Sequence, residues 1–168
     1  MSLEVTRPRK LEKSDDRSGF SSGAPELDEW IAKYAWQNQA ANSATTYVVT
    51  ESSRVIGYYA IAMSAYEKGL APQQMSKHMP NQIPCILLAR LAVDMEYQGS
   101  GWGLDLLRDA LLRSAGLSDS IGAAAVLIHC RDEAARDFYL GHGNFVQSPV
   151  EELHLMVSMK VLKTYTDS

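Results

Sequence analysis

Residues 87–107 combine an apolar run, a glycine-rich turn and an amphipathic segment, and this succession constrains the fold more than any other stretch. The apolar run at 87–93 is short and leads into polar residues, which is typical of a strand buried on both faces. Residues 99–103 then alternate glycine with serine and tryptophan, and leucines at helical spacing follow. The stretch predicts a buried strand, a loop and a helix in direct succession.

Three glycines between the end of a strand and the start of a helix have two explanations. They relax a tight turn, or they let backbone N–H groups close on a phosphate at the positive end of the helix dipole. The spacing favours the anion site. It is not a dinucleotide fingerprint, because the last glycine lacks the two-residue step, and it is not a P-loop, because no Gly-Lys-Ser or Gly-Lys-Thr follows.

Length and composition bound the class of protein. A chain of 168 residues, 46% of them hydrophobic, predicts one domain, 1–168, with a substantial core. Because no apolar run approaches the ~20 residues of a membrane span and no signal peptide is visible, we expect a cytoplasmic protein without membrane contact. Cys85 and Cys130 lie in apolar runs without metal-ligand spacing, so we expect buried free thiols and no metal.

A net charge of −4 counts against broad, nonspecific nucleic-acid binding. It leaves room for a local basic patch.

The first helix is expected to begin at Pro25, which suits the first helical position and is followed by acidic residues that favour a helix N-terminus. Asn42 and Ser43 are expected to end it. Trp36 falls off its apolar stripe, which consists of Leu27, Trp30, Ile31, Tyr34 and Ala35.

The rest of the chain alternates strands and helices without a repeat or a linker, which fits one α/β domain around a central mixed sheet. A long loop or short helix is expected at 66–82. Gly116 is a plausible helix C-cap, Asp132 can cap the next helix, and Gly141 and Gly143 should stop that helix. The other expected strands are 3–11, 45–50, 55–63, 123–129, 145–146 and 154–161.

Four segments resemble the GNAT acetyltransferases. Residues 98–103, QGSGWG, match the Q/R-x-x-G-x-G/A acetyl-CoA loop of that family. FSSGAPELD at 20–28 with Asn38 and Gln39, LARLAVD at 88–94 and ARDFY at 135–139 resemble its toxin branch, the toxins of type II toxin–antitoxin systems that acetylate aminoacyl-tRNA.

The resemblance covers nearly the whole chain. It implies the α/β (α+β) GNAT fold, with a central, mixed, mostly antiparallel twisted sheet flanked by helices and with splayed central strands.

The resemblance also implies a site for acetyl-CoA and no metal. The Val93 amide would donate to the thioester carbonyl, an oxyanion-hole contribution, and Tyr139 would lie near the sulfur. The loop amides would bind the pyrophosphate and the end of the strand would face the pantetheine arm. The cofactor-binding residues would be Leu91, Ala92, Val93, Gln98, Gly99, Ser100, Gly101, Trp102, Gly103 and Leu104.

Tyr139 would, from spacing alone, be a tyrosine packed on a helix stripe. A phenol titrates near ~10 and a thiol near ~8.5, so full proton transfer to a thiolate is uphill by about two kcal/mol. We therefore expect Tyr139 to act as a hydrogen-bond donor, or as an acid with a lowered pKa. The chain departs from the family pattern after this helix, where an extra residue separates Gly143 from Phe145.

No pair of residues stands out as a general base. His129, at the end of an expected strand, fits a satisfied core histidine better than a base. A free α-amine titrates near ~8 and lysine near ~10.4, so neutralising lysine costs roughly three kcal/mol more. The absence of an evident base fits an amine of low pKa, such as that of an aminoacyl ester.

The strongest candidate for a contact to RNA is Arg90, which lies beside the cofactor strand and matches the toxin pattern. The other candidates are individually ordinary solvated charges, namely Arg7, Arg9, Lys10, Lys33 and Lys77. Three arginines are candidates for acidic groups of coenzyme A instead, namely Arg108, Arg113 and Arg136.

Three functions are open at this point. The first is a toxin that acetylates the α-amine of aminoacyl-tRNA and blocks translation, with a ribbon-helix-helix antitoxin as partner and homodimerisation as a further possibility. The second is a GNAT enzyme that acetylates a small amine, a polyamine or a protein amine, which the negative charge favours. The third is a GNAT fold retained for binding only, against which the intact loop and Tyr139 argue.

Overall fold

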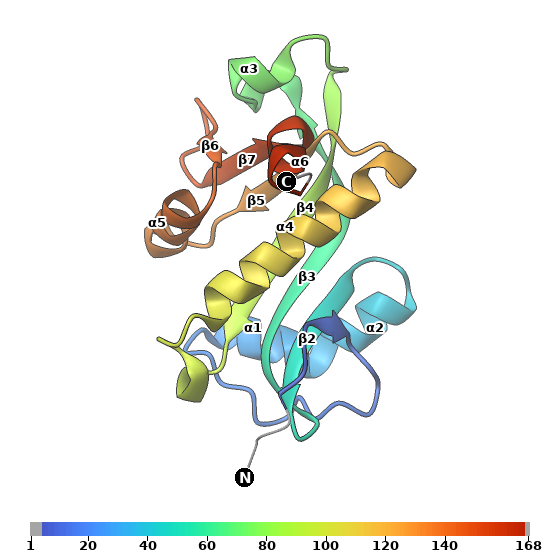
Figure 1. Cartoon of the computed structure of the whole chain (residues 1–168), viewed down its shortest axis with the longest axis vertical. Coiled ribbons are helices and arrows are strands. Elements are labelled where there is room, and N and C mark those ends of the chain that lie inside the picture. The colour runs from blue at the N-terminus through green and yellow to red at the C-terminus, as the bar shows by residue number, and fades with distance from the viewer. Residues whose placement is uncertain (1–4, 167–168) are drawn as a thin grey trace. The chain divides into compact units, whose positions relative to one another are not determined.

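The structure is a computed structural model that describes residues 5–166 (Figure 1). Seven strands in this part of the chain form one sheet with the order β1-β2-β3-β4-β5-β7-β6. The strands are β1 (Arg9–Lys10), β2 (Thr45–Glu51), β3 (Arg54–Glu67), β4 (Gln82–Val93), β5 (Ala125–His129), β6 (Val146–Gln147) and β7 (His154–Ser158). The α-helices are α1 (Pro25–Glu29), α2 (Ala35–Ala40), α3 (Gln73–Ser76), α4 (Trp102–Ile121), α5 (Glu133–His142) and α6 (Met159–Thr166).

The strand pairs β1–β2, β2–β3, β5–β7 and β6–β7 are antiparallel, as the resemblance implied. The pair of β4 and β5 is parallel and joins Cys85 to Ala125 and Leu87 to Leu127. The chain divides into two compact units. The first unit contains Met1–Ala62 and Ala89–Ala110, and the second contains Met63–Leu88 and Leu111–Ser168.

The first unit is built on the β2–β3 hairpin (Figure 1). Ser52 and Ser53 make its turn with positive φ angles of 50° and 70°. The strand expected at 3–11 is wrong in extent, because only β1 pairs with β2, Val5 makes a single bridge to Glu51, and residue 3 lies outside the described residues. The core of the unit consists of Leu11, Phe20, Trp30, Ile31, Ala35, Val48, Val55, Tyr58, Ala60 and Ala92.

The first helix is interrupted by a π-helical turn, η1 (Trp30–Tyr34), in which the N–H of Ala35 bonds to the carbonyl of Trp30. One extra residue in that turn shifts the apolar stripe along the sequence. Tyr34 is therefore 40% exposed, contrary to the expected stripe, while Trp36 packs against the core. The helix ends before Asn42, whose φ is +59°, as expected.

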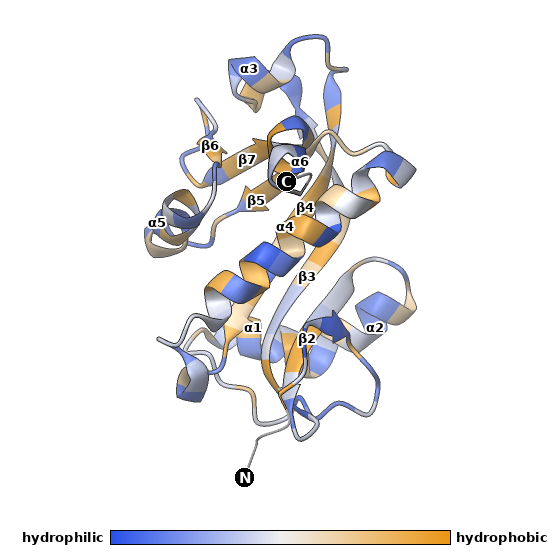
Figure 2. Ribbon diagram, in the orientation of Figure 1, coloured by the Kyte–Doolittle hydropathy of each residue, from blue (hydrophilic) through white to orange (hydrophobic). Residues whose placement is uncertain are grey.

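In the second unit, residues 82–88 of β4 are followed in the sheet by β5, β7 and β6. Hydrophobic residues dominate β5 and β7 (Figure 2). The expected strand at 154–161 ends at Ser158, and the remainder is helix α6. The segment 66–82 is partly strand, because β3 runs to Glu67, followed by the 3-10 turn η2 (Lys68–Leu70) and α3. The core of the unit consists of Tyr66, Ala71, Met75, Ile83, Cys85, Ala125, Leu127 and Met156.

Two glycines lie inside helices that they were expected to end. Helix α4 passes through Gly116 and ends before Gly122, whose φ of +69° suits a C-cap. Gly141 lies within α5, and Gly143 follows its last residue. A Cβ atom on Gly143 would lie 2.7 Å from the Phe145 ring, so this close approach requires glycine. Asp132 caps α5 as expected, because its side chain accepts the N–H of Ala135 at 2.8 Å.

Candidate active site

The glycine-rich loop connects β4 to α4 within the first unit. Gly99 and Gly101 have φ angles of +83° and +89°, a conformation that L side chains rarely adopt, and a Cβ atom on either would meet no other group. Glycine is thus required here by backbone conformation, not by crowding. Because α4 begins at Trp102, the first N–H groups of a twenty-residue helix follow the loop without intrahelical partners. The arrangement suits an anion.

The side chain of Gln98 is engaged by the protein itself. Its Nε2 donates to the carbonyl of Val93 at 2.7 Å and to the carbonyl of Ser22 at 2.8 Å. The predicted cofactor residue Gln98, the first of the loop at 98–104, is thus tied back to Val93 at the end of β4.

Asp94 is a site-building residue that the sequence interpretation missed. It is 4% exposed, and its carboxylate accepts the N–H of Glu96 at 3.0 Å and that of Ser21 at 3.1 Å. The Met95 N–H donates in return to the Ser21 carbonyl at 2.8 Å. The sequence interpretation had singled out the motif at 20–28, which contains the partner Ser21. Sequence periodicity could not show that this motif lies next to residue 94.

The end of β4 lies close to β3 in the first unit. A Cβ atom on Gly57 would lie 3.6 Å from the Ala92 carbonyl and 3.1 Å from Cδ1 of Leu106. Glycine at 57 thus allows strand β3 to approach both strand β4 and helix α4. Ala92 and Val93 are buried and Leu91 is half-buried.

Arg90 is held against an aromatic stack in the first unit. Its guanidinium lies 4.4 Å from the centroid of the Trp30 ring, and Trp30 stacks on Tyr58 at 6.0 Å. The Tyr58 hydroxyl donates to the Leu27 carbonyl at 2.7 Å, which fixes the stack to helix α1. Burial lowers the pKa of Arg90 from its usual value. No acidic side chain pairs with Arg90 among residues 5–166.

The other candidate cations are solvated or paired. Arg9 makes a two-point ion pair with Asp15, Lys33 lies 3.7 Å from Glu29, and Arg136 lies 3.5 Å from Asp137. Exposed positions in the described residues are occupied by Arg7, Lys10, Lys77 and Arg108.

Tyr139 lies in α5 in the second unit and is 7% exposed. Its ring packs edge-on against Phe145 and Phe138. Burial raises the pKa of Tyr139 well above its usual value, and the nearby Cys130 adds to the rise. The expectation that Tyr139 is an acid with a lowered pKa is therefore wrong. Of the two expected roles, that of a hydrogen-bond donor remains. The Tyr139 hydroxyl has no hydrogen-bond partner among residues 5–166, so its proton is available to a ligand.

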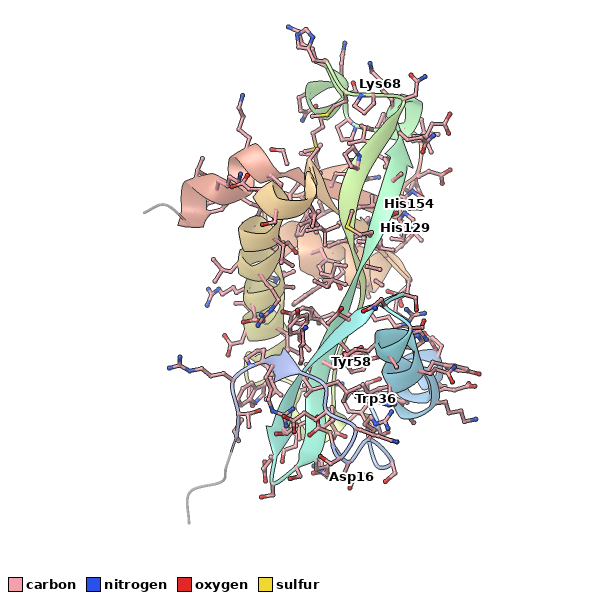
Figure 3. The ribbon with its side chains drawn as sticks, turned by 90° about the vertical axis from the view of Figure 1, so that its right-hand side faces the viewer. Asp16, Trp36, Tyr58, Lys68, His129 and His154 are labelled. Atoms are coloured by element: carbon pink, nitrogen blue, oxygen red, sulfur yellow. The ribbon has the colours of Figure 1, made fainter. Side chains whose placement is uncertain are left out.

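His129 is exposed at the end of β5, so the expectation of a satisfied core histidine is wrong. Its ring stacks on that of His154, with the ring centroids 4.0 Å apart. Figure 3 labels the two histidines next to each other. The buried Tyr66 hydroxyl lies 2.9 Å from Nδ1 of His154. Desolvation and the neighbouring His154 lower the pKa of His129 from its usual value.

Cys85 and Cys130 are buried free thiols, as expected, and burial raises the pKa of each to about 11. Within residues 5–166, no group of three or more His, Cys, Asp or Glu is placed to hold a metal ion. In the same part of the chain, no helix has the length and apolar character needed to cross a membrane.

Comparison with known proteins gives two informative relatives. The chain is 42% identical over 153 residues to a tRNA-acetylating toxin of Mycobacterium tuberculosis, which covers 91% of this chain and 92% of the relative. It is 36% identical over 125 residues to a probable toxin TacT of Sinorhizobium fredii, which covers 70% of this chain and 69% of that protein. No family model matches the chain.

Solved structures share the fold. A tyrosine-to-phenylalanine mutant of KacT superposes with a TM-score of 0.88 at 24% identity, covering 98% of this chain and 99% of that one. AtaT in complex with acetyl-methionyl-tRNAfMet gives 0.88 at 23% identity, covering 97% and 99%. An AtaT mutant bound to the C-terminus of the antitoxin AtaR and acetyl-CoA gives 0.82 at 22% identity, covering the whole of both chains.

Proposed function

The chain belongs to the tRNA-acetylating toxins, which have the GNAT acetyltransferase fold, and we therefore propose that it transfers the acetyl group of acetyl-CoA to the α-amine of aminoacyl-tRNA. The observation that carries this is the 42% identity to a tRNA-acetylating toxin over 91% of the chain. An acetylated α-amine is no longer a nucleophile for peptide-bond formation, so the product blocks translation.

In this reaction, the amine nitrogen attacks the thioester carbonyl carbon, the C–S bond breaks, and coenzyme A leaves as the thiolate while the amine loses a proton. Residues 98–104 would bind the pyrophosphate through their backbone N–H groups, next to the N-terminus of α4. Leu91, Ala92 and Val93 would run along the pantetheine arm. The Val93 N–H would donate to the carbonyl oxygen as negative charge develops there.

Tyr139 would stabilise the leaving thiolate by a hydrogen bond without giving up its proton. The raised pKa of its phenol supports this, because full transfer to a thiolate then costs more than the about two kcal/mol of an unperturbed tyrosine. The proton lost by the amine balances the charge of the thiolate. An α-amine close to neutral at pH 7 requires no dedicated base.

We propose Arg90 as a contact to the tRNA. The cation held on Trp30 supports this, because a stacked guanidinium keeps its N–H edges for phosphate or base oxygens. We propose a cytoplasmic location, which a tRNA acceptor supports. The antitoxin-bound form of AtaT supports an antitoxin partner, for which we propose a ribbon-helix-helix protein, and we propose a homodimer as the assembly.

The test incubates the protein with labelled acetyl-CoA and a mixed pool of charged tRNA, and measures acetyl on the released amino acids. We expect label on the α-amines. Tyr139→Phe should lower kcat about a hundredfold with little change in the KM for acetyl-CoA. Tyr34→Phe is the matched control, because Tyr34 is exposed and its hydroxyl is not engaged.

Absence of label from charged tRNA, with acetyl-CoA still bound, would refute the tRNA acceptor. Acetylation of a small amine or a protein amine under the same conditions would then identify the second candidate function.

A further inference from the structure

We propose that Gln98 is a positioning residue that fixes the Val93 peptide and ties the segment at 21–22 to the acetyl-CoA loop, and that its side chain does not touch the pyrophosphate. The inference rests on the proposed function, which assigns residues 98–104 to the pyrophosphate and the Val93 N–H to the thioester carbonyl.

The hydrogen bonds of Gln98 leave no donor for a phosphate. A glutamine side chain has two N–H donors on one nitrogen. Both are used, on the Val93 carbonyl at 2.7 Å and on the Ser22 carbonyl at 2.8 Å. Because both partners are carbonyl oxygens, the amide nitrogen must face them, and only the side-chain oxygen remains. An oxygen acceptor does not bind a phosphate oxygen.

The bond to Val93 immobilises the peptide that follows this residue. Gln98 holds the carbonyl of that peptide, while its N–H, which belongs to Asp94, donates to the Ile56 carbonyl at 2.8 Å. Both polar groups of this peptide, its carbonyl and its N–H, are therefore hydrogen-bonded. The orientation of the Val93 N–H depends on these two hydrogen bonds, because only the α-carbon of Val93 separates this N–H from the fixed peptide.

The bond to Ser22 joins the loop to the N-terminal segment. Two further bonds run between the same segments, from the Ser21 N–H to the Asp94 carboxylate at 3.1 Å and from the Met95 N–H to the Ser21 carbonyl at 2.8 Å. The Ser22 hydroxyl donates in turn to Asp28 in α1 at 2.6 Å. The motif at 20–28 thus holds the acetyl-CoA loop in place through these hydrogen bonds. The sequence alone did not reveal this role of the motif.

A positioning residue and a pyrophosphate ligand respond differently to a shortened donor. Acetyl-pantetheine carries the thioester and the arm but no pyrophosphate. If Gln98 acts through Val93, its loss must cost activity with both donors. If it touched the pyrophosphate, its loss would cost activity with acetyl-CoA alone.

The experiment measures kcat/KM for charged tRNA acetylation with acetyl-CoA and with acetyl-pantetheine. The variants are Gln98→Met, which removes both donors, and Gln98→Glu, which turns an oxygen toward two carbonyls. We expect Gln98→Met to lose about tenfold with either donor, and Gln98→Glu to lose more. Thermal unfolding of each variant shows that the fold is retained.

Two controls bracket the result. Gly101→Ala strains a loop residue at φ +89° and should cost activity with acetyl-CoA far more than with acetyl-pantetheine. Gln37→Met makes the same chemical change at an exposed position of α2 and should cost nothing with either donor.

A loss by Gln98→Met that disappears with acetyl-pantetheine would overturn the proposal. If the unaltered protein acetylates no charged tRNA, the proposed function fails, and calorimetry with acetyl-CoA and coenzyme A then tests Gln98 independently. A positioning role predicts that Gln98→Met reduces the preference for the acetylated form. An equal weakening of both ligands would contradict it.

Discussion

Arg90 is held in place by an aromatic ring rather than by a carboxylate. A guanidinium over Trp30 keeps a fixed direction while its donors stay unpaired within residues 5–166, which suits a contact to a phosphate. We expect Arg90→Ala to raise the KM for aminoacyl-tRNA about tenfold and to leave the KM for acetyl-CoA unchanged, measured by initial rates. Lys33→Ala is the control, since Lys33 is exposed and faces Glu29. An equal rise of both KM values would contradict an RNA contact.

At the scale of single residues, the buried carboxylate of Asp15 makes the free energy of unfolding depend on pH. Burial alone raises its pKa, but hydrogen bonds from Arg9 and the Glu12 N–H outweigh burial, and the net pKa is lowered. A lowered folded-state pKa contributes stability that is complete above the unfolded value of about 3.9 and is lost as the pH falls through the folded value.

We expect Asp15→Asn to unfold with about 2 kcal/mol less free energy at pH 7. The gap to the unaltered protein should shrink below about pH 4 and close below the folded-state pKa, as measured by urea denaturation across pH. Asp137→Asn, an exposed carboxylate, should show no such gap. A gap that persists at low pH would show that packing, not charge, is the cause.

At the scale of elements, the π-turn is a one-residue insertion into an otherwise regular helix. Deletion of Lys33 shortens the step from Trp30 to Ala35 by one residue and so returns both to the buried face of a regular α-helix. We expect this deletion to lower the free energy of unfolding by at most about 1 kcal/mol, measured by chemical denaturation.

Deletion of Gln37 is the matched comparison, because it lies in α2, beyond the π-turn. It rotates Gln39, whose side chain bonds to the Leu11 carbonyl at 2.9 Å and to the Thr46 N–H at 3.0 Å. This deletion should cost about 2 kcal/mol or more. Equal costs for the two deletions would mean that the π-turn itself stabilises the helix.

The elements also show what the sequence could predict. The strand–loop–helix succession at 87–107, the hairpin and the Asp132 cap follow from local patterns, and the structure confirms them. The π-turn, the end of α4 beyond Gly116 and the change from strand to helix at Met159 do not, because tertiary packing decides them. In the site, the sequence locates the loop but not the partners of Gln98, which are backbone carbonyls 5 and 76 residues away.

For the whole molecule, charge sets how the protein meets an anionic acceptor. The chain has 20 acidic and 16 basic residues, and a net charge of −4 gives no general attraction to RNA. Several cations are already paired with carboxylates, among them Arg9, Arg54, Arg131 and Lys163. If the proposed function holds, we expect tRNA binding to rest on a few phosphate contacts rather than on an extended basic face.

Salt dependence tests this directly, because each phosphate contact releases counterions from the nucleic acid. With about two to three contacts, log Kd should rise with log[KCl] at a slope of about 2, so a fourfold rise in salt should weaken binding about fifteenfold. Filter binding of charged tRNA to the protein without acetyl-CoA gives the slope, and Arg90→Ala should reduce it by about 1. A slope above about 5 would indicate an extended basic surface and contradict this prediction, and a slope near zero would favour a small amine as the acceptor.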